Sequence, residues 1–96
     1  MEILVTYDVM TDSAEGRRRL RRVAKVCERF GQRVQYSVFE CSVNEMQLER
    51  LRERLLAILD EARDSLRIYR LGGRREEAVE AYGRDHYVNF DDPLVL

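Results

Sequence analysis

The residue best placed for chemistry is Asp8, a carboxylate that ends a short run of β-branched and aromatic residues. The run Glu2–Asp8 (EILVTYD) is typical of a β-strand, so Asp8 is expected where the chain leaves a sheet. A carboxylate there suits a hard cation such as Mg²⁺, which accepts one or two carboxylates and keeps several waters. On the strand pattern alone a structural role, capping the loop or accepting from backbone donors, is the more common one for such a residue. One Asp8 alone makes a poor metal site, whereas two copies across a dimer axis make a fair one.

A run of basic residues downstream is the second group that could do chemistry. Between residues 14 and 35 the chain has eight basic and two acidic residues. Six of the basic residues cluster closely: Arg17, Arg18, Arg19, Arg21, Arg22 and Lys25. At helical spacing Arg18, Arg22 and Lys25 share one polar face, and guanidinium groups bind phosphates in bidentate fashion. The cluster therefore fits a nucleic-acid backbone, and it fits a solvated helix face balanced by acidic residues elsewhere equally well.

Two residues of the segment Gly31–Glu40 extend the nucleic-acid interpretation. Arg33 is placed to meet a phosphate and Phe39 to stack on a base. The alternation of apolar and polar residues around them is also that of an ordinary half-buried strand. From the residues alone, both interpretations stay open.

The first half of the chain predicts the elements that hold these residues. Apolar residues recur at helical spacing up to Phe30, which predicts a helix with Asp12 at its N-cap and Gly31 just beyond its end. The stretch Gln32–Val43 is long for one strand. It predicts two short strands about a turn near residues 35–37.

The second half predicts a helix, a strand and a short extension. Asn44 is typical of an N-cap, and apolar spacing predicts a helix from Glu45 to about Ala62. Residues 65–71 (SLRIYRL) predict a strand that a pair of glycines closes. Residues 76–82 (EEAVEAY) favour a helix by propensity, but the segment is too short for propensity to decide.

The order of these elements is β-α-β-β-α-β, that of the ferredoxin-like α+β fold. We expect a single domain over residues 1–96, with a core at about 1–73 and an extension at 74–96. Helices cover one face of such a sheet, and the other face is expected to hold Tyr69 or Tyr7, and Phe39, depending on register. A second copy of the chain is the simplest cover for that face, so we expect a homodimer.

Composition narrows the class of protein. The chain has 96 residues, 45% of them hydrophobic, which is enough for one packed core. Its 17 basic and 18 acidic residues give a net charge of −1, which excludes a wholly basic nucleic-acid coat but not a basic face. Two cysteines and one histidine show no zinc-binding spacing. With no signal-like segment and no apolar run near about 20 residues, we expect a cytoplasmic protein with reduced thiols and no membrane contact.

Several segments taken together resemble one family. They are YDV at the end of the first strand, RRRLRRVAKVC, GQRVQYSVFEC, DSLRIYRLG and the terminal DPLVL. They are similar to the CRISPR-associated protein two family, the small nuclease-like subunit of the CRISPR adaptation machinery. The basic stretch resembles that of type I-C members. The likeness covers essentially the whole chain, and GQRVQYSVFEC with DSLRIYRLG is a specific combination.

The resemblance implies a symmetric ferredoxin-like homodimer whose C-terminal strand, at about residues 76–83 here, packs on the partner subunit. It also implies that Asp8 is the catalytic and metal-binding residue and that Mg²⁺ is the cofactor. The residues that it places around the cleft are Tyr7, Arg17, Arg19, Arg33 and Phe39. Helical spacing adds Arg18 and Arg22 as candidate phosphate contacts.

The function implied by the resemblance is that of a metal-dependent endonuclease of RNA or double-stranded DNA. It would act in spacer acquisition with the CRISPR integrase of family one. One alternative is a non-catalytic dimeric DNA-binding scaffold that bridges integrase dimers, and another is a ferredoxin-like RNA-binding or ligand-sensing module unconnected with CRISPR. Residues 76–92, with six acidic residues and one arginine, depart from what a DNA-holding subunit is expected to show.

Overall fold

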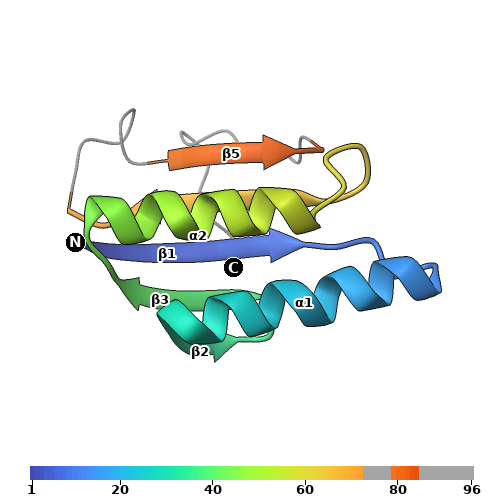
Figure 1. Cartoon of the computed structure of the whole chain (residues 1–96), viewed down its shortest axis with the longest axis horizontal. Helices are drawn as coiled ribbons and strands as arrows, with labels where there is room; N and C mark the ends of the chain where they lie inside the picture. The colour runs from blue at the N-terminus through green and yellow to red at the C-terminus, as the bar shows by residue number, and fades with distance from the viewer. Residues whose placement is uncertain (73–78, 85–96) are drawn as a thin grey trace, which may run out of the picture.

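The computed structural model of the chain describes residues 1–72 and 79–84. Its elements are β1 (Glu2–Asp8), α1 (Ala14–Phe30), β2 (Gly31–Gln35), β3 (Val38–Ser42), α2 (Glu45–Ile58), β4 (Ser65–Arg70) and β5 (Val79–Gly83). The strands form one antiparallel sheet in the order β2-β3-β1-β4-β5, and both helices lie on the same face of it (Figure 1). The predicted α+β fold with an additional C-terminal strand is therefore confirmed.

The core fills the layer between the sheet and the two helices. Because side chains alternate along a strand, every second residue of the central strands points into this layer. The largest fully buried side chains are Phe39, Ile3, Leu48, Leu51, Leu55, Leu66, Ile68, Val5 and Val23. Tyr7 is also buried there, which leaves Tyr69 of the two alternatives for the uncovered face. The expectation that Phe39 lies on that face was wrong.

The face of the sheet away from the helices carries a different set of side chains. Leu4 pairs with Tyr69 across β1 and β4, and Thr6 pairs with Val38 across β1 and β3. All four are partly exposed and belong to the opposite parity from the buried residues. Tyr69 is thus the aromatic residue that the register assigns to this face.

The helix α1 ends at Phe30 as predicted, but its capping residues differ from the prediction. Its N-cap is Ser13, not Asp12, and the Ser13 hydroxyl accepts a hydrogen bond of 3.0 Å from the backbone N–H of Gly16. At the other end Gly31 is extended and begins β2 directly, so it is not a left-handed helix terminus. A Cβ on Gly31 would collide with the Glu40 carbonyl of β3, and glycine therefore allows the close approach of the two strands.

The start of α2 was predicted correctly and its end was not. Asn44 and Gln47 form the reciprocal capping box that their spacing indicates. The helix ends at Ile58 rather than near Ala62, because Asp60 organises a turn of its own. The Asp60 carbonyl accepts from the backbone N–H of Asp64 at 2.7 Å, and its side chain accepts from that of Ala62 at 3.0 Å.

The ambiguous C-terminal segment forms a strand. β5 pairs with β4 of the same chain, with Leu66 opposite Tyr82 and Ile68 opposite Glu80. A helix over this segment, as propensity favoured, is therefore wrong for residues 79–83, and residues 76–78 lie outside the described part of the chain. Packing of this strand on a partner subunit stays a prediction.

Candidate nucleic-acid and metal site

Asp8 is the last residue of β1, and its side chain is exposed. The chain then turns through a short loop into α1. The loop is fixed from below, because the backbone N–H of Met10 donates a hydrogen bond of 3.0 Å to Oδ1 of Asp64. Gly16 allows the loop to lie this close to the helix, since a Cβ there would meet the Met10 carbonyl oxygen. Asp8 itself is placed by its pairing with Ser65 of β4, and the loop that follows it is held by a buried carboxylate that the sequence pattern does not mark.

Asp64 is the one buried charged side chain among the described residues. Arg19 donates to it twice, from Nε to Oδ2 at 2.8 Å and from Nη2 to Oδ1 at 3.3 Å. The backbone N–H of Asp60 adds a bond of 2.9 Å to Oδ2. Burial raises the pKa of Asp64, but these donors and the Met10 amide outweigh burial and hold that pKa below its usual value.

This ion pair changes the role of Arg19. Its side chain is only 15% exposed and its guanidinium group is engaged by Asp64. Arg19 therefore lies beneath the Asp8 loop as a structural partner of Asp64, and its predicted contact with nucleic acid stays a prediction. The only signal for Asp64 in the sequence is its place at the start of the motif DSLRIYRLG.

The turn between β2 and β3 lies beside the end of β1. The backbone N–H of Tyr7 donates to the Ser37 carbonyl at 3.1 Å, and the Tyr7 hydroxyl donates to the Tyr36 carbonyl at 3.5 Å. Burial, followed by the neighbouring Cys27 thiol, raises the pKa of Tyr7, and Arg33 partly offsets the rise. Tyr7 is therefore a buried neutral donor that holds the turn in place, and it is not a surface contact.

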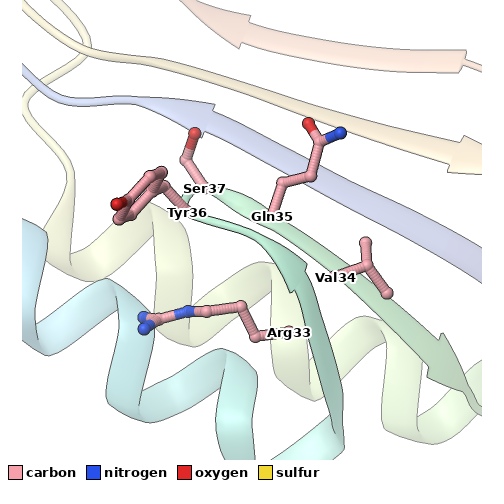
Figure 2. A pocket seen from close by; sticks show the side chains of 5 residues that line it. All are labelled: Arg33, Val34, Gln35, Tyr36 and Ser37. Atoms are coloured by element: carbon pink, nitrogen blue, oxygen red, sulfur yellow. The ribbon is translucent and has the colours of Figure 1, made fainter.

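A groove of about 470 Å³ opens between this turn, the loop after β1 and the middle of α1. Asp8, Arg21, Arg33 and Tyr36 are among the residues that line it. It shares Arg33, Tyr36 and Ser37 with a wider hollow along the β2–β3 hairpin, drawn in Figure 2. The structure thus brings the predicted residues Asp8 and Arg33 to one groove.

Phe39 lies under this groove and cannot reach it. Its side chain is fully buried, and its ring packs against Tyr7 with centroids 6.3 Å apart and planes at 22°. The Arg33 guanidinium group lies over the same ring, 5.2 Å from the centroid. Phe39 therefore supports Arg33 from below, and the prediction that Phe39 stacks on a base is wrong for this conformation. The exposed aromatic residue at the groove is Tyr36, which the sequence analysis did not single out.

The remaining basic residues of α1 point to different places. Arg17, Arg18, Arg21 and Arg22 are all exposed, and Nη1 of Arg17 donates to the Thr11 carbonyl at 3.4 Å. A second hollow, of about 370 Å³, lies between α1 and α2. Its basic lining residues are Arg22, Lys25, Arg29 and Arg54. Outside the buried pair, α1 thus offers cations both to the Asp8 groove and to a basic hollow.

The donors available for a metal ion are limited in one chain. Among residues 1–72 and 79–84 no three acidic, cysteine or histidine side chains lie together in a group that could hold a metal ion. One Asp8 supplies a hard carboxylate, and Mg²⁺ needs one or two of these with waters in its other positions. The side chain fits Mg²⁺ by type and exposure, and two copies of Asp8 brought together would complete the set of carboxylates.

Neither cysteine belongs to the site. Burial raises the pKa of the Cys27 thiol to about 12 and that of the Cys41 thiol to about 11, so both stay protonated at neutral pH. Both therefore act as small apolar side chains of the core. Within the described residues, neither helix has the length and apolar content that crossing a bilayer requires.

Comparisons with known proteins point to one family. A family model described as CRISPR associated protein Cas2 matches residues 1–79. A Moorella thermoacetica protein named "CRISPR-associated endoribonuclease Cas2 1" is 57% identical over 96 residues, covering 100% of both chains. A Halalkalibacterium halodurans protein named "CRISPR-associated endonuclease Cas2" is 50% identical over 96 residues, again covering 100% of both. The crystal structure of Streptococcus pyogenes Cas2 gives a TM-score of 0.71 at 52% identity, covering 80% of this chain and 93% of that one.

Proposed function

Because the chain belongs to the Cas2 family of CRISPR-associated proteins, we propose that it is a Mg²⁺-dependent endonuclease that cleaves RNA or DNA in spacer acquisition. The observation that carries this proposal is the placement of Asp8, an exposed carboxylate in a groove whose lining also includes Arg21 and Arg33. Guanidinium groups bind phosphate oxygens, and a carboxylate beside them is placed to act on the same phosphodiester. Full-length relatives named endoribonuclease or endonuclease support the same reaction.

The active species in this proposal is a homodimer. One chain supplies a single Asp8, and the uncovered face of its sheet carries the partly exposed side chains Leu4, Val38 and Tyr69. A second copy would cover that face. A symmetric arrangement that also brought the two Asp8 carboxylates together would form the metal site.

In this proposal different residues of the chain bind the metal ion, bind the phosphate oxygens and fix the loop after Asp8. When bound, Mg²⁺ supplies positive charge that polarises the phosphodiester and makes a bound water more acidic. The two Asp8 carboxylates would hold the ion, and the Asp8 of the second chain would be the group to accept the proton of the attacking water. Arg33, supported by the Phe39 ring, and Arg21 bind phosphate oxygens on either side. The buried pair of Arg19 and Asp64 keeps the loop after Asp8 in one conformation.

A second candidate function is a DNA-binding scaffold that bridges dimers of the CRISPR integrase of family one. The observation that favours it is the basic hollow between α1 and α2, because that hollow and the Asp8 groove have no lining residue in common. Arg22, Lys25, Arg29 and Arg54 could follow a duplex backbone without placing a phosphate at Asp8. The two functions are compatible in one dimer.

The variant Asp8→Asn tests the nuclease function. It keeps the shape of the side chain and removes its charge, so cleavage of labelled RNA and DNA in Mg²⁺ should fall to the level seen with EDTA. Duplex binding and the dimer mass by light scattering should stay unchanged, since the basic residues and the sheet are untouched. Asp12→Asn is the matched control, because Asp12 is an exposed carboxylate in the same loop that does not line the groove. It should cleave as well as the parent protein.

Two outcomes would decide between the candidate functions. Cleavage by Asp8→Asn at the parental rate would remove Asp8 from the reaction and with it the proposed metal site. Loss of cleavage together with unimpaired spacer integration beside the integrase would favour the scaffold as the cellular function.

A further inference from the structure

Tyr36 is the most exposed large hydrophobic side chain of the described residues, at 94%. It stands at the tip of the β2–β3 turn. A single exposed aromatic residue is ordinary on a protein surface and carries no function by itself. Its neighbours make this one different, because Tyr36 lines the same groove as Asp8, Arg21 and Arg33.

The register of the sheet places Tyr36 close to Asp8. Thr6 of β1 pairs with Val38 of β3, and the N–H of Tyr7 bonds to the Ser37 carbonyl. Because β1 and β3 are antiparallel, the next residue toward the turn is Asp8 on the β1 side and Tyr36 on the β3 side, so the two lie close together. The Tyr7 hydroxyl also donates to the Tyr36 carbonyl at 3.5 Å, so the backbone under the ring is tied to β1. The ring is therefore exposed on an anchored turn.

The charge around Tyr36 suits a nucleotide. Arg33 and Tyr36 extend toward the same side of the hairpin, whereas Val34 and Gln35 extend to the other side (Figure 2). Arg33 is held over the buried Phe39 ring, and its contact with Glu28, at 3.9 Å between two largely exposed groups, is weak. A phosphate in the groove would thus meet Arg33 while the adjoining base met the exposed ring of Tyr36.

We propose that Tyr36 is a stacking platform for one unpaired nucleobase, with Arg33 binding the adjoining phosphate. The occupant is a single-stranded segment of RNA or DNA, because a base within a duplex has both faces covered by its neighbours. Aromatic stacking accepts every base, so the platform selects unpaired over paired nucleotides and not one sequence over another. As a binding site the platform is independent of cleavage, and only its link to the cleaved strand rests on the proposed function.

Tryptophan fluorescence offers a direct test, because the chain contains no tryptophan. In Tyr36→Trp the introduced indole reports from the platform alone. With EDTA present, a single-stranded oligonucleotide should quench its emission to saturation, and an abasic oligonucleotide of the same length should not. The matched control is Met46→Trp, at a 63% exposed position in the first turn of α2, whose emission should not change.

Binding measurements complete the test. By fluorescence anisotropy Tyr36→Ala should weaken binding of the single strand by roughly 5- to 150-fold, the effect of losing one stacked base. Tyr36→Phe should retain the parental affinity, and duplex binding should be the same in all three proteins. A single strand that binds to Tyr36→Trp without quenching its indole would overturn the proposal. So would an indole already shielded from solvent in the free dimer, since a second copy would then occupy the position.

The platform and the nuclease can fail separately. Quenching of the Tyr36→Trp indole together with absent Mg²⁺-dependent cleavage would keep the platform and remove the nuclease. The opposite result is cleavage that depends on Asp8 while Tyr36→Ala binds the single strand as tightly as the parent protein. It would keep the nuclease and remove the platform.

Discussion

Two arginine–carboxylate pairs with similar geometry hold different parts of the molecule. Beneath the Asp8 loop, Nε of Arg19 lies 2.8 Å from Asp64 Oδ2, and at the edge strand β5 Nε of Arg52 lies 2.7 Å from Glu80 Oε1. The Asp64 side chain is completely buried and also accepts two backbone amides. The Glu80 side chain is 20% exposed, and its further partners are side chains, the Tyr82 hydroxyl at 2.8 Å and the Arg70 guanidinium at 3.8 Å.

The contrast shows that surroundings, not the contact itself, decide what an ion pair does. Asp64 links α1, the loop after β1 and the turn before β4, so its loss would leave partly buried donors without their buried acceptor. Glu80 links α2 to β5 at the rim of the sheet, where water can replace a lost contact. The first pair is therefore built into the Asp8 site, and the second only fastens an edge strand.

The largest effect should come from removing the Asp64 carboxylate. Asp64→Ala leaves the Arg19 guanidinium and two backbone amides unpaired in a buried place, which should lower the free energy of unfolding by about 3–5 kcal/mol. Glu80→Ala removes a pair of similar length that is partly open to water, and it should cost only about 1–2 kcal/mol. Urea unfolding of both variants measures the difference. Equal losses would mean that the two pairs are equivalent and that burial does not separate them.

Much of the fold could be predicted because local rules govern it. The strand ending at Asp8, the turn within residues 32–43 and the capping box at Asn44 each depend on neighbouring residues, and all three are confirmed. The early end of α2 depends on the turn at Asp60, where a polar side chain competes with the helix for backbone groups. Local spacing alone does not decide that competition.

The site was harder to predict because it depends on contacts distant in sequence. Arg19 and Arg18 are adjacent and chemically identical, yet only Arg19 meets Asp64, 45 residues away. Phe39 looked available for a base because strand alternation does not say which face a helix will cover. Tyr36 lies in a predicted turn, where an aromatic side chain has no core to pack into. Its exposure could therefore have been predicted from the sequence.

The next effect separates arginines that bind nucleic acid from the arginine that binds Asp64. If Arg17, Arg18 and Arg22 contact phosphates, changing all three to Ala should weaken duplex binding and flatten its dependence on salt, by about 0.9 in log–log slope for each lost contact. Arg19→Ala should lower stability and leave the slope unchanged, because its guanidinium group already has a partner. Titrations by anisotropy at several salt concentrations provide both slopes. A change of slope in folded Arg19→Ala would place Arg19 at the interface instead.

The smallest expected effect is the dependence of folding stability on pH in acid. Hydrogen bonds from Arg52 and Tyr82 outweigh burial and hold the pKa of Glu80 below its usual value, and Asp64 is likewise lowered. A carboxyl whose pKa is lower in the folded than in the unfolded chain stabilises the fold above its unfolded pKa, about 4 for both residues. That stabilisation is lost as the pH falls from there through the folded pKa. Stability should therefore change little between about pH 7 and pH 5 from this cause and decline below about pH 4.

Neutral variants at the two pairs sharpen the comparison in acid. Asp64→Asn and Glu80→Gln each remove one group that takes up a proton on unfolding, so each should reduce the acid slope by at most about 1.4 kcal/mol per pH unit. Both variants should be less stable than the parent protein at neutral pH and approach it as the pH falls, because the parent then loses the same charge. The gap at neutral pH should be wider for Asp64→Asn, whose amide stays buried beside Arg19. Urea unfolding across this range measures both slopes, and a parental acid slope in both variants would show that neither carboxyl has a lowered pKa in the folded chain.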